Sequence, residues 1–422
     1  MRYRLGDICT ITKGGTGIMK AIPGPFTMVA LGEANKTHDE YQFDAKAAII
    51  PLVSSTGHGH ASMKRVKYQE GKFALGNILC AVIPKDENFV LAKYLHIYLH
   101  WNREELLVSQ MKGMANVSLS LNKIADVEVI VPSIEKQKEI VELEKTLIIK
   151  ELEADKLYSD QLTQLENLNQ AILQEAVQGK LVAQDAADEP ASKLLKRIKA
   201  EKAASSKKEK PLPAIKAEEI PFEIPENWVW CRLGEIVSVL GDGLHGTPNY
   251  TANGEYYFIN GNNLINGKIE MKDTTKRVSE EEYNKHKKSL TENTILVSIN
   301  GTLGNLAFYE NEKIILGKSA CYFNLNDLID KYYIGKYIKS TYFLKYAVEV
   351  ASETTIKNVS LKSMRLLPIP LPPLSEQKRI VAEIERQLEK TKQLKAHIIA
   401  NQLATEQLLK ALLHGAFEVE EK

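Results

Sequence analysis

The stretch VSVLGDGLHG, residues 237–246, contains glycines at the spacing of a dinucleotide-binding turn. Gly241, Gly243 and Gly246 form G-x-G-x-x-G, in which the last glycine should begin a helix that holds a pyrophosphate. The next residues, TPNYTANGEYYFING, instead predict a loop, a turn and an aromatic strand. We therefore interpret these glycines as a tight turn between strands and keep a nicotinamide or flavin enzyme as a minor alternative.

Other arrangements that could support catalysis are incomplete. His58 and His60 flank a glycine, but no Asp, Glu or Cys stands at a recognisable spacing for a metal site. The sequence has no G-x-x-x-x-G-K-[ST] phosphate loop and no Asn/Asp-Pro-Pro-aromatic segment like those of amino-methyltransferases. We expect no catalytic residue, cofactor or metal on this chain.

Composition indicates an ordinary cytoplasmic protein of two or three domains. Hydrophobic residues make up 44% of the 422 residues, and no segment approaches the roughly 20 apolar residues that span a bilayer. The cysteines occur singly, which predicts reduced, mostly buried thiols; they are Cys9, Cys80, Cys231 and Cys321.

The net charge of +1 conceals an alternation along the chain. Residues 1–131 contain 15 basic and 12 acidic side chains, and residues 228–372 contain 17 and 15. Residues 132–227 are acidic, with 15 basic and 19 acidic side chains. If a nucleic acid is the ligand, excesses of three and two positive charges neutralise few of its phosphates, and the isolated chain should hold it weakly at physiological salt.

The chain contains two copies of one sequence unit. Short motifs recur in the same order at offsets between 228 and 244, which chance does not explain. The pairs are Arg4–Ile8 with Arg232–Ile236, Leu52–Ser54 with Leu296–Ser298, Leu75-Gly76 and Cys80 with Leu316-Gly317 and Cys321, and VPSIEKQKEIV (131–141) with LPPLSEQKRIV (371–381).

Each unit begins with a domain of short β-type runs and ends with a long helix. The runs, separated by Gly, Asn and Pro and interrupted by helical patches, predict an α+β class. We place the parts as follows: domain 1 at 1–131, helix 1 at 132–180, a linker at 181–227, domain 2 at 228–372, helix 2 at 373–415 and a tail at 416–422.

The two helices show the apolar spacing of helices that pair. Antiparallel pairing about a pseudo-two-fold axis would place the two domains at opposite ends of a rod about 60 Å long; packing of each helix on its own domain is the alternative. Ser133 and Ser375 are expected N-caps, and Gly179 and Gly415 expected helix stops. The packing positions are Ile140, Leu147, Leu157, Leu165, Leu168, Ile172, Ile380, Ile384, Leu388, Ile398, Leu408 and Leu412.

The linker contains the run KLLKRIKAEKAASSKKEKPLP. We expect a short helix before Pro211 and then a solvated tether that leads to domain 2.

These features together resemble the specificity subunits of type I restriction-modification systems over essentially the whole chain. The resemblance is carried by LPPLSEQKRIV and VPSIEKQKEIV, the RLG-[DE]-I starts and the segment ILVSINGTLGN. It implies two target-recognition domains that bind a split DNA sequence, joined by helices that set the gap. It also implies two methyltransferase subunits that use S-adenosylmethionine to methylate adenines, and motor-nuclease subunits, where present, that use ATP and Mg²⁺.

Base recognition requires donors and acceptors on loops that enter a groove. In this interpretation GDGLHG, like KGGTG at residues 13–17, brings backbone and polar side chains close to DNA. The candidates in domain 1 are Ser54, Ser55, Thr56, His58, His60, Lys64, Arg65 and Lys67. Those in domain 2 are Asp242, His245, Thr247, Asn249, Asn260, Asn262, Asn263, Asn300, Thr302 and Asn305. For each of them a purely turn-forming role is an equal alternative, and a coiled-coil scaffold that does not bind DNA is the alternative for the whole chain.

Overall fold

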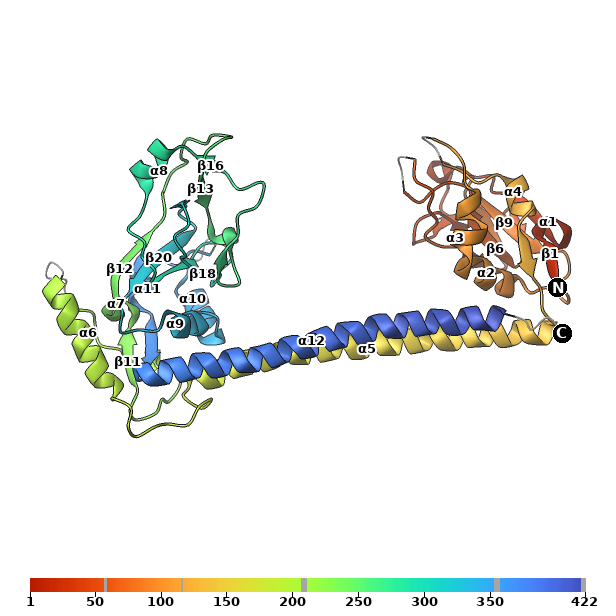
Figure 1. The fold of residues 1–422 in the computed structure, drawn as a ribbon. Helices are drawn as coiled ribbons and strands as arrows, with labels where there is room; N and C mark the ends of the chain where they lie inside the picture. Colours follow the sequence, from red (N-terminus) through yellow and green to blue (C-terminus); the bar gives the residue numbers. More distant parts are fainter. Residues whose placement is uncertain (57–58, 115–116, 206–210, 353–356, 419–422) are drawn as a thin grey trace. The chain divides into compact units, whose positions relative to one another are not determined.

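The computed structural model describes residues 1–56, 59–114, 117–205, 211–352 and 357–418 (Figure 1). The chain divides into two compact units, Met1–Asp160 with Ile398–Lys422, and Gln161–His397. Each unit contains one β-rich domain and part of both long helices. None of the helices in the described ranges has an apolar stretch that could cross a membrane.

The first unit consists of a four-stranded antiparallel sheet, a four-stranded mixed sheet and a short ladder that joins the chain start to the strand before the long helix. Its strands are β1 (Arg2–Arg4), β2 (Cys9–Lys13), β3 (Phe26–Val29), β4 (Lys36–His38), β5 (Phe43–Asp44), β6 (Ala47–Pro51), β7 (Lys67–Gln69), β8 (Lys72–Leu75), β9 (Leu79–Pro84) and β10 (Glu128–Ile130). Its helices are α1 (Leu5–Ile8), η1 (Ile18–Lys20), α2 (Ala92–Trp101), α3 (Arg103–Leu106), η2 (Val108–Gln110), α4 (Leu121–Ala125) and the first part of α5 (Ile134–Val177).

The second unit repeats this plan. Its strands are β11 (Val229–Arg232), β12 (Val237–Asp242), β13 (Tyr256–Ile259), β14 (Leu264–Ile265), β15 (Lys268–Ile269), β16 (Arg277–Val278), β17 (Thr294–Ser298), β18 (Leu306–Phe308), β19 (Ile314–Leu316), β20 (Ala320–Leu325) and β21 (Pro368–Leu371). Its helices are α6 (Ala191–Ser205), η3 (Ala217–Glu219), α7 (Leu233–Ile236), η4 (Gly261–Asn263), α8 (Glu280–His286), α9 (Lys331–Ile338), α10 (Thr341–Val350), α11 (Leu361–Leu366) and part of α12 (Leu374–Phe417).

The sheet order confirms the predicted duplication and the α+β class. The order β2-β9-β6-β7 in the first unit matches β12-β20-β17-β18 in the second, and the parallel pair β3-β8 matches β13-β19. Strands β6 and β17 are buried on both faces, so their runs are continuously apolar rather than alternating. All four cysteines are free and buried, as predicted.

One predicted correspondence is wrong by three residues. Cys80 pairs with Ile50 across β9 and β6, and Cys321 pairs with Val297 across β20 and β17. Ile50, and not Val53, is therefore the counterpart of Val297. The similar letters LVS misled the alignment, because in the first unit they follow the strand and in the second they lie within it.

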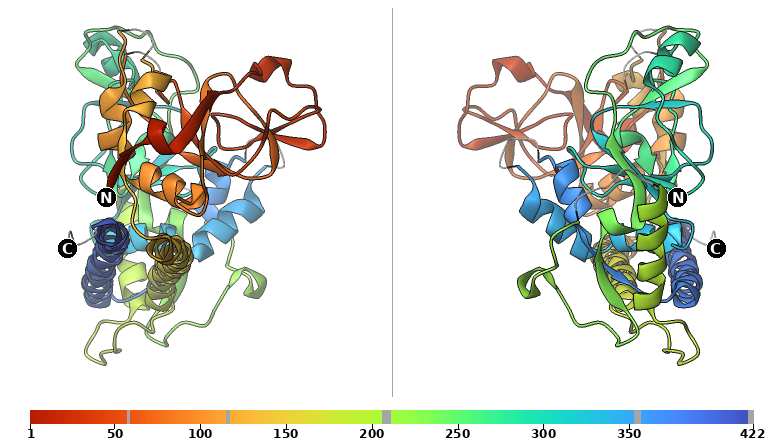
Figure 2. Two further views of the ribbon diagram at one scale, coloured as in Figure 1. Left: turned by 90° about the vertical axis from the view of Figure 1, so that its right-hand side faces the viewer. Right: turned by 90° about the vertical axis from the view of Figure 1, so that its left-hand side faces the viewer.

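The long helices are antiparallel within each unit, as predicted, and Figure 2 shows them end-on and adjacent. Each contains 44 residues, about 66 Å at 1.5 Å per residue. In the first unit Leu143 lies in one apolar cluster with Phe417, and further along the Tyr158 and Thr405 hydroxyls are 2.9 Å apart. In the second unit Thr391 donates to Asn169 at 2.7 Å.

The predicted seam is only partly correct. Buried positions include Ile140, Leu165, Ile172, Ile380, Ile384 and Ile398, and Leu147 and Leu388 are half-buried. Leu157, Leu168, Leu408 and Leu412 are 47–59% exposed, so they are not buried in the seam. Two paired helices can bury one stripe each, whereas the apolar spacing covers a wider face. Ile140 and Ile380 pack in the cores of their own domains. Each long helix therefore packs on its own domain near its start and on the other long helix further along.

The predicted helix ends are half correct. The Ser133 hydroxyl accepts the N–H of Lys136 at 3.3 Å, which confirms this N-cap. Gly179 has φ of 73°, and Lys180 donates its N–H to Glu175 O at 2.9 Å, the pattern of a glycine C-cap.

The other two predicted ends are wrong. Ser375 lies inside α12, and Pro373 O accepts the N–H of Gln377 at the position that Ser133 occupies in α5. Gly415 also lies inside α12, because the helix continues to Phe417, whose ring packs 5.2 Å from Tyr98. Tertiary packing outweighs the weak preference of glycine for a helix end.

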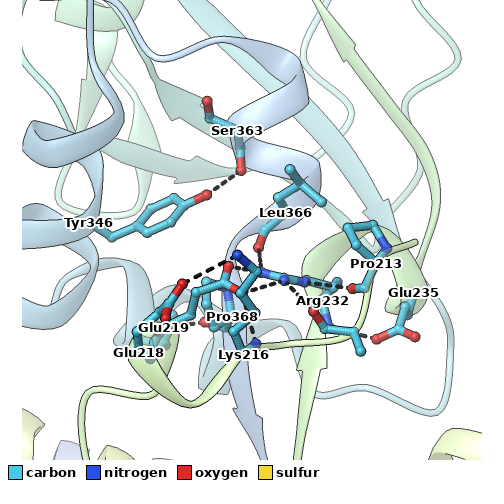
Figure 3. Close-up of polar contacts among 12 residues, drawn as sticks. Pro213, Lys216, Glu218, Glu219, Arg232, Glu235, Tyr346, Ser363, Leu366 and Pro368 are labelled. Atoms are coloured by element: carbon cyan, nitrogen blue, oxygen red, sulfur yellow. Dashed lines mark hydrogen bonds and ion pairs between the residues drawn. The ribbon is translucent and has the colours of Figure 1, made fainter.

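The short helix predicted before Pro211 is confirmed as α6, whereas the tether predicted after it is wrong for the described residues, because this segment is attached to domain 2 at Arg232. Helix α6 packs on α7 and buries Leu194 and Ile198 (Figure 1). After residue 210, the chain wraps around Arg232, which is 3% exposed. Its guanidinium donates to both carboxylate oxygens of Glu219, at 2.7 and 2.8 Å, and to Leu366 O at 2.7 Å (Figure 3). The charged, proline-rich composition concealed this docking, because only a few apolar residues, such as Leu194 and Ile198, are buried by it.

Candidate nucleic-acid interface

The glycine-rich loop of the second domain is held against a turn at residues 316–320, which we call the second central turn. Leu244 donates its N–H to Leu316 O at 2.6 Å and accepts the N–H of Lys318 at 3.1 Å. Gly317 donates to Ile259 O at 2.8 Å, which attaches the end of β13 to the same turn. Two chain segments thus meet at one point through main-chain hydrogen bonds alone.

Two further loops reach the second central turn through Ser319. Gly261 donates its N–H to the Ser319 hydroxyl at 2.8 Å, and that hydroxyl donates to Asn260 Oδ1 at 3.1 Å. Ile299 and Asn300 donate their N–H groups to Ser319 O at 3.0 and 3.2 Å. The structure therefore brings the predicted loops at 242–249, 260–263 and 300–305 together.

The first domain contains the same arrangement at residues 75–79, the first central turn. Thr16 donates its N–H to Leu75 O at 3.3 Å and accepts the N–H of Asn77 at 3.0 Å. Gly76 donates to Val29 O at 3.1 Å. These bonds have the same roles as those made by Leu244 and Gly317 in the second domain.

Two glycines make this approach possible. A Cβ on Gly14 would overlap the carbonyl oxygen of Gly76, and a Cβ on Gly243 would overlap that of Gly317. This confirms the predicted equivalence of KGGTG and GDGLHG as tight glycine turns. The next elements after Gly246 are strand β13 and the short η4, so the helix that a dinucleotide turn requires is missing from this described stretch.

Several predicted contacts of the second domain serve the fold instead. Asn263 is 7% exposed and donates to Glu270 O at 2.9 Å, while Asn249 is held by Glu282 and Asn260 by Ser319. Asp242 is hydrogen-bonded to His245. The remaining exposed candidates are His245, Thr247 and Asn262 near the glycine-rich loop and η4, and Thr302. Asn249 is exposed but bound to Glu282, and Asn300 and Asn305 are half-buried.

In the first domain the hydroxyl residues form an internal network. Ser54 donates to His60 O at 2.6 Å, the Thr56 and Ser62 hydroxyls lie 2.9 Å apart, and Ser55 accepts the N–H of Lys64 at 3.1 Å. This network closes the loop on itself and leaves its serines with their hydrogen bonds already made. His58 lies outside the described residues.

The basic candidates of the same loop differ in availability. Lys67 donates to Ala30 O at 2.8 Å and to Gly32 O at 2.6 Å, so it fastens a neighbouring loop, and burial lowers its pKa. Arg65 forms an ion pair with Glu33 at 3.2 Å. Lys64 and His60 are exposed.

Two histidines that were not among the predicted candidates, His96 and His100, hold the end of this loop by hydrogen bonds. Val66 donates its N–H to His100 Nδ1 at 3.2 Å, and His96 Nε2 lies 3.2 Å from Val66 O. Burial, followed by nearby positive charges, lowers the pKa of His96 to about 3 and that of His100 to about 4. Both rings are therefore neutral at pH 7. His96 and His100 are four residues apart on a helix and so lie on the same face. This spacing is a sequence signal that the two side chains contact a common partner, which here is Val66.

Asn77 and Lys318, which directly follow the repeated pairs Leu75-Gly76 and Leu316-Gly317, were not among the predicted candidates. Their signal was a repeated glycine followed by an unmatched residue. Within the described ranges, no three His, Cys, Asp or Glu side chains are grouped as a metal site would require.

The family model for the type I restriction modification DNA specificity domain matches residues 1–159 and 225–403. The chain belongs to this family. The specificity subunit of the EcoAI type I restriction enzyme of Escherichia coli is 32% identical over 240 residues, 54% of this chain and 40% of that protein. The EcoEI specificity subunit of the same organism is 30% identical over 267 residues, 60% of this chain and 45% of that protein. These matches thus span less than half of either relative.

Solved structures of the family have the same fold. The crystal structure of the HsdS subunit from Thermoanaerobacter tengcongensis matches with a TM-score of 0.56 at 17% identity, over 99% of this chain and 96% of that one. A chain from a structure titled for complex assembly and conformational transition of the type I R-M system matches with a TM-score of 0.62 at 17% identity, over 99% and 97%.

Proposed function

We propose that this chain is the DNA-specificity subunit of a type I restriction-modification complex. It binds a two-part DNA sequence, one part with each β-rich domain, and carries no catalytic group. Two partner subunits methylate adenines with S-adenosylmethionine, and motor-nuclease subunits, if the system has them, use ATP and Mg²⁺. Because the proposed ligand is DNA, we place the chain in the cytoplasm.

The observation that carries this proposal is the pair of central turns. Both domains fix the same main-chain arrangement but differ in the predicted candidates that they expose, which are Thr56, His60 and Lys64 in one and His245, Thr247, Asn262 and Thr302 in the other. A common support with different donors and acceptors suits two readers of unlike base sequences.

The helix pair supports the proposal of partner subunits. In the first unit several large apolar side chains on both helices remain exposed: Ile148, Leu152, Leu157, Leu403, Leu408 and Leu412, at 41–66%. The antiparallel register places α5 and α12 members of this set at corresponding levels. Exposed apolar rows on a water-facing helix pair are typical of surfaces that a partner covers.

Methylation mapping tests the function directly. The genome of the source cell is sequenced for methylated adenines with and without this gene. We expect loss of one two-part motif with a fixed gap, and replacement of residues 2–131 by those of another family member should change one half only. A motif that persists without the gene would refute the proposal, and a partner-bound chain that selects no duplex from a random pool would favour a scaffold.

A further inference from the structure

We propose that Asn77 and Lys318 are specificity-determining residues, one for each half of the DNA sequence. The inference rests on the proposed function and adds the residues and the base types. Both residues are the third position of a central turn, directly after Gly76 and Gly317, and both are exposed. The two domains therefore present one variable side chain at the same structural position.

The backbone around each residue is fixed on both sides. The N–H of Asn77 is bound to Thr16 O, and the N–H of Lys318 to Leu244 O. The following residues are also fastened, because Leu52 donates to Ile78 O at 2.9 Å as Ile299 donates to Ser319 O. A side chain on such a support loses little backbone entropy when it binds, which favours precise recognition.

The polar ends of both side chains are available. Among the described residues, no carboxylate forms an ion pair with the Lys318 ammonium, and no group is hydrogen-bonded to the Asn77 amide. Most of the previously predicted asparagines and serines nearby are bound within the fold. Asn77 and Lys318 therefore have unused donors at the point where the loops of each domain meet.

The two residue types predict different bases. An asparagine amide matches the N6 and N7 edge of adenine in the major groove, whereas a lysine donates to O6 and N7 of guanine. We therefore expect an A·T pair at the Asn77 position of one half-site and a G·C pair at the Lys318 position of the other.

The test uses the assembled complex with its methyltransferase partners and single-molecule mapping of methylated adenines. Lys318→Ala should reduce discrimination at one base pair of one half-site by about tenfold or more. Lys318→Asn should shift the preference at that pair from G·C to A·T, and Asn77→Lys should produce the opposite shift in the other half. Lys285→Ala and Asn88→Ala, exposed residues of the same types elsewhere in each domain, are the controls.

The outcomes separate this inference from the function. If the unmodified complex methylates no two-part motif, the proposed function fails. If it does, and Lys318→Asn and Asn77→Lys variants with unchanged thermal unfolding keep every base preference, the assignment of these two residues is wrong. A change that spans both half-sites for either variant would also overturn it, since each residue is assigned to one half.

Discussion

The side-chain carbonyl of Gln377 accepts the backbone N–H of Asp330 at 2.9 Å. Its amide donates to Pro372 O at 3.0 Å, and the side chain is fully buried. In the first unit Gln137 accepts the N–H of Leu91 at 2.8 Å in the same way. One glutamine in each unit thus fastens the start of a long helix to the segment that begins a helix of the adjacent domain.

Replacement of Gln377 by leucine should therefore destabilise the second unit. It removes the partners of a buried N–H and a buried carbonyl, which costs about 1–3 kcal/mol for each group left unsatisfied. We expect a loss of roughly 2–4 kcal/mol, measured by native-state hydrogen exchange of amides in α9 and α12. Gln387→Leu, a half-exposed glutamine of the same helix, should change the free energy by less than about 0.5 kcal/mol.

Acidification should loosen the first domain through its half-buried histidines, His96 and His100. The pKa of His100 falls from its ordinary value of 6.5 to about 4 in the folded state. A lowered pKa contributes stability that is present above pH 6.5 and is lost as the pH falls toward 4. His100→Asn keeps an acceptor for the Val66 N–H but does not titrate. Between pH 7 and 4 the free energy of unfolding should fall less in this variant, by on the order of 2 kcal/mol; equal slopes would contradict the assignment.

Arg232 and Arg4 occupy equivalent positions but should differ in importance. Arg232→Ala leaves several carbonyls and Glu219 without their donor, and we expect a loss of about 2–4 kcal/mol together with faster proteolysis within residues 211–227. Arg4 is exposed, because no segment of the described chain wraps around it. Arg4→Ala should therefore change stability by no more than about 0.5 kcal/mol.

The isolated chain should bind its duplex weakly and with a modest salt dependence. The small positive excess of each domain allows few phosphate contacts, so the slope of log K against log salt should be no steeper than about −5. This slope can be measured by fluorescence anisotropy at salt concentrations of about 50 to 200 mM, which include the physiological value. Nanomolar binding by the chain alone at physiological salt would show that it needs no partner for its grip on the phosphates.

If helix length sets the unread gap, adding one heptad to both helices should lengthen that gap. Residues 152–158 and 402–408 lie at corresponding levels of the antiparallel pair, because Tyr158 contacts Thr405 and Gln402 donates to Asp155. Duplicating both segments adds about 10 Å. That length is about three base pairs of B-DNA. Methylation mapping should show a gap longer by about this number. Duplication in α5 alone should instead disrupt helix pairing and lower methylation.

Much of this architecture was predictable because it depends on local patterns that occur twice. The duplicated motifs, the long helices, the Ser133 cap and the Gly179 stop all follow from spacing and residue type. The failures share one cause, which is tertiary contact. Phe417 extends a helix past Gly415, Arg232 orders a charged linker, and internal partners bind Asn263, and none of these has a local signal.

The exposed leucines and the candidate DNA contacts show the same limit. An apolar spacing predicts that a face is buried but does not identify the protein that buries it. Polar residues in a loop predict hydrogen bonds but not whether these form within the protein, as for Ser54, or with a ligand. Comparison of the two copies identified residues 77 and 318, which occupy the same position in both central turns and are exposed in each.

The central turns are held almost entirely by main-chain groups, and this has an evolutionary consequence. Main-chain bonds do not depend on which side chains decorate the turn, apart from the glycines that allow close approach. Residues 77 and 318 can therefore mutate without endangering folding. Under the proposed function, single substitutions at these two positions would change the DNA sequence that is read and leave the supporting backbone unchanged.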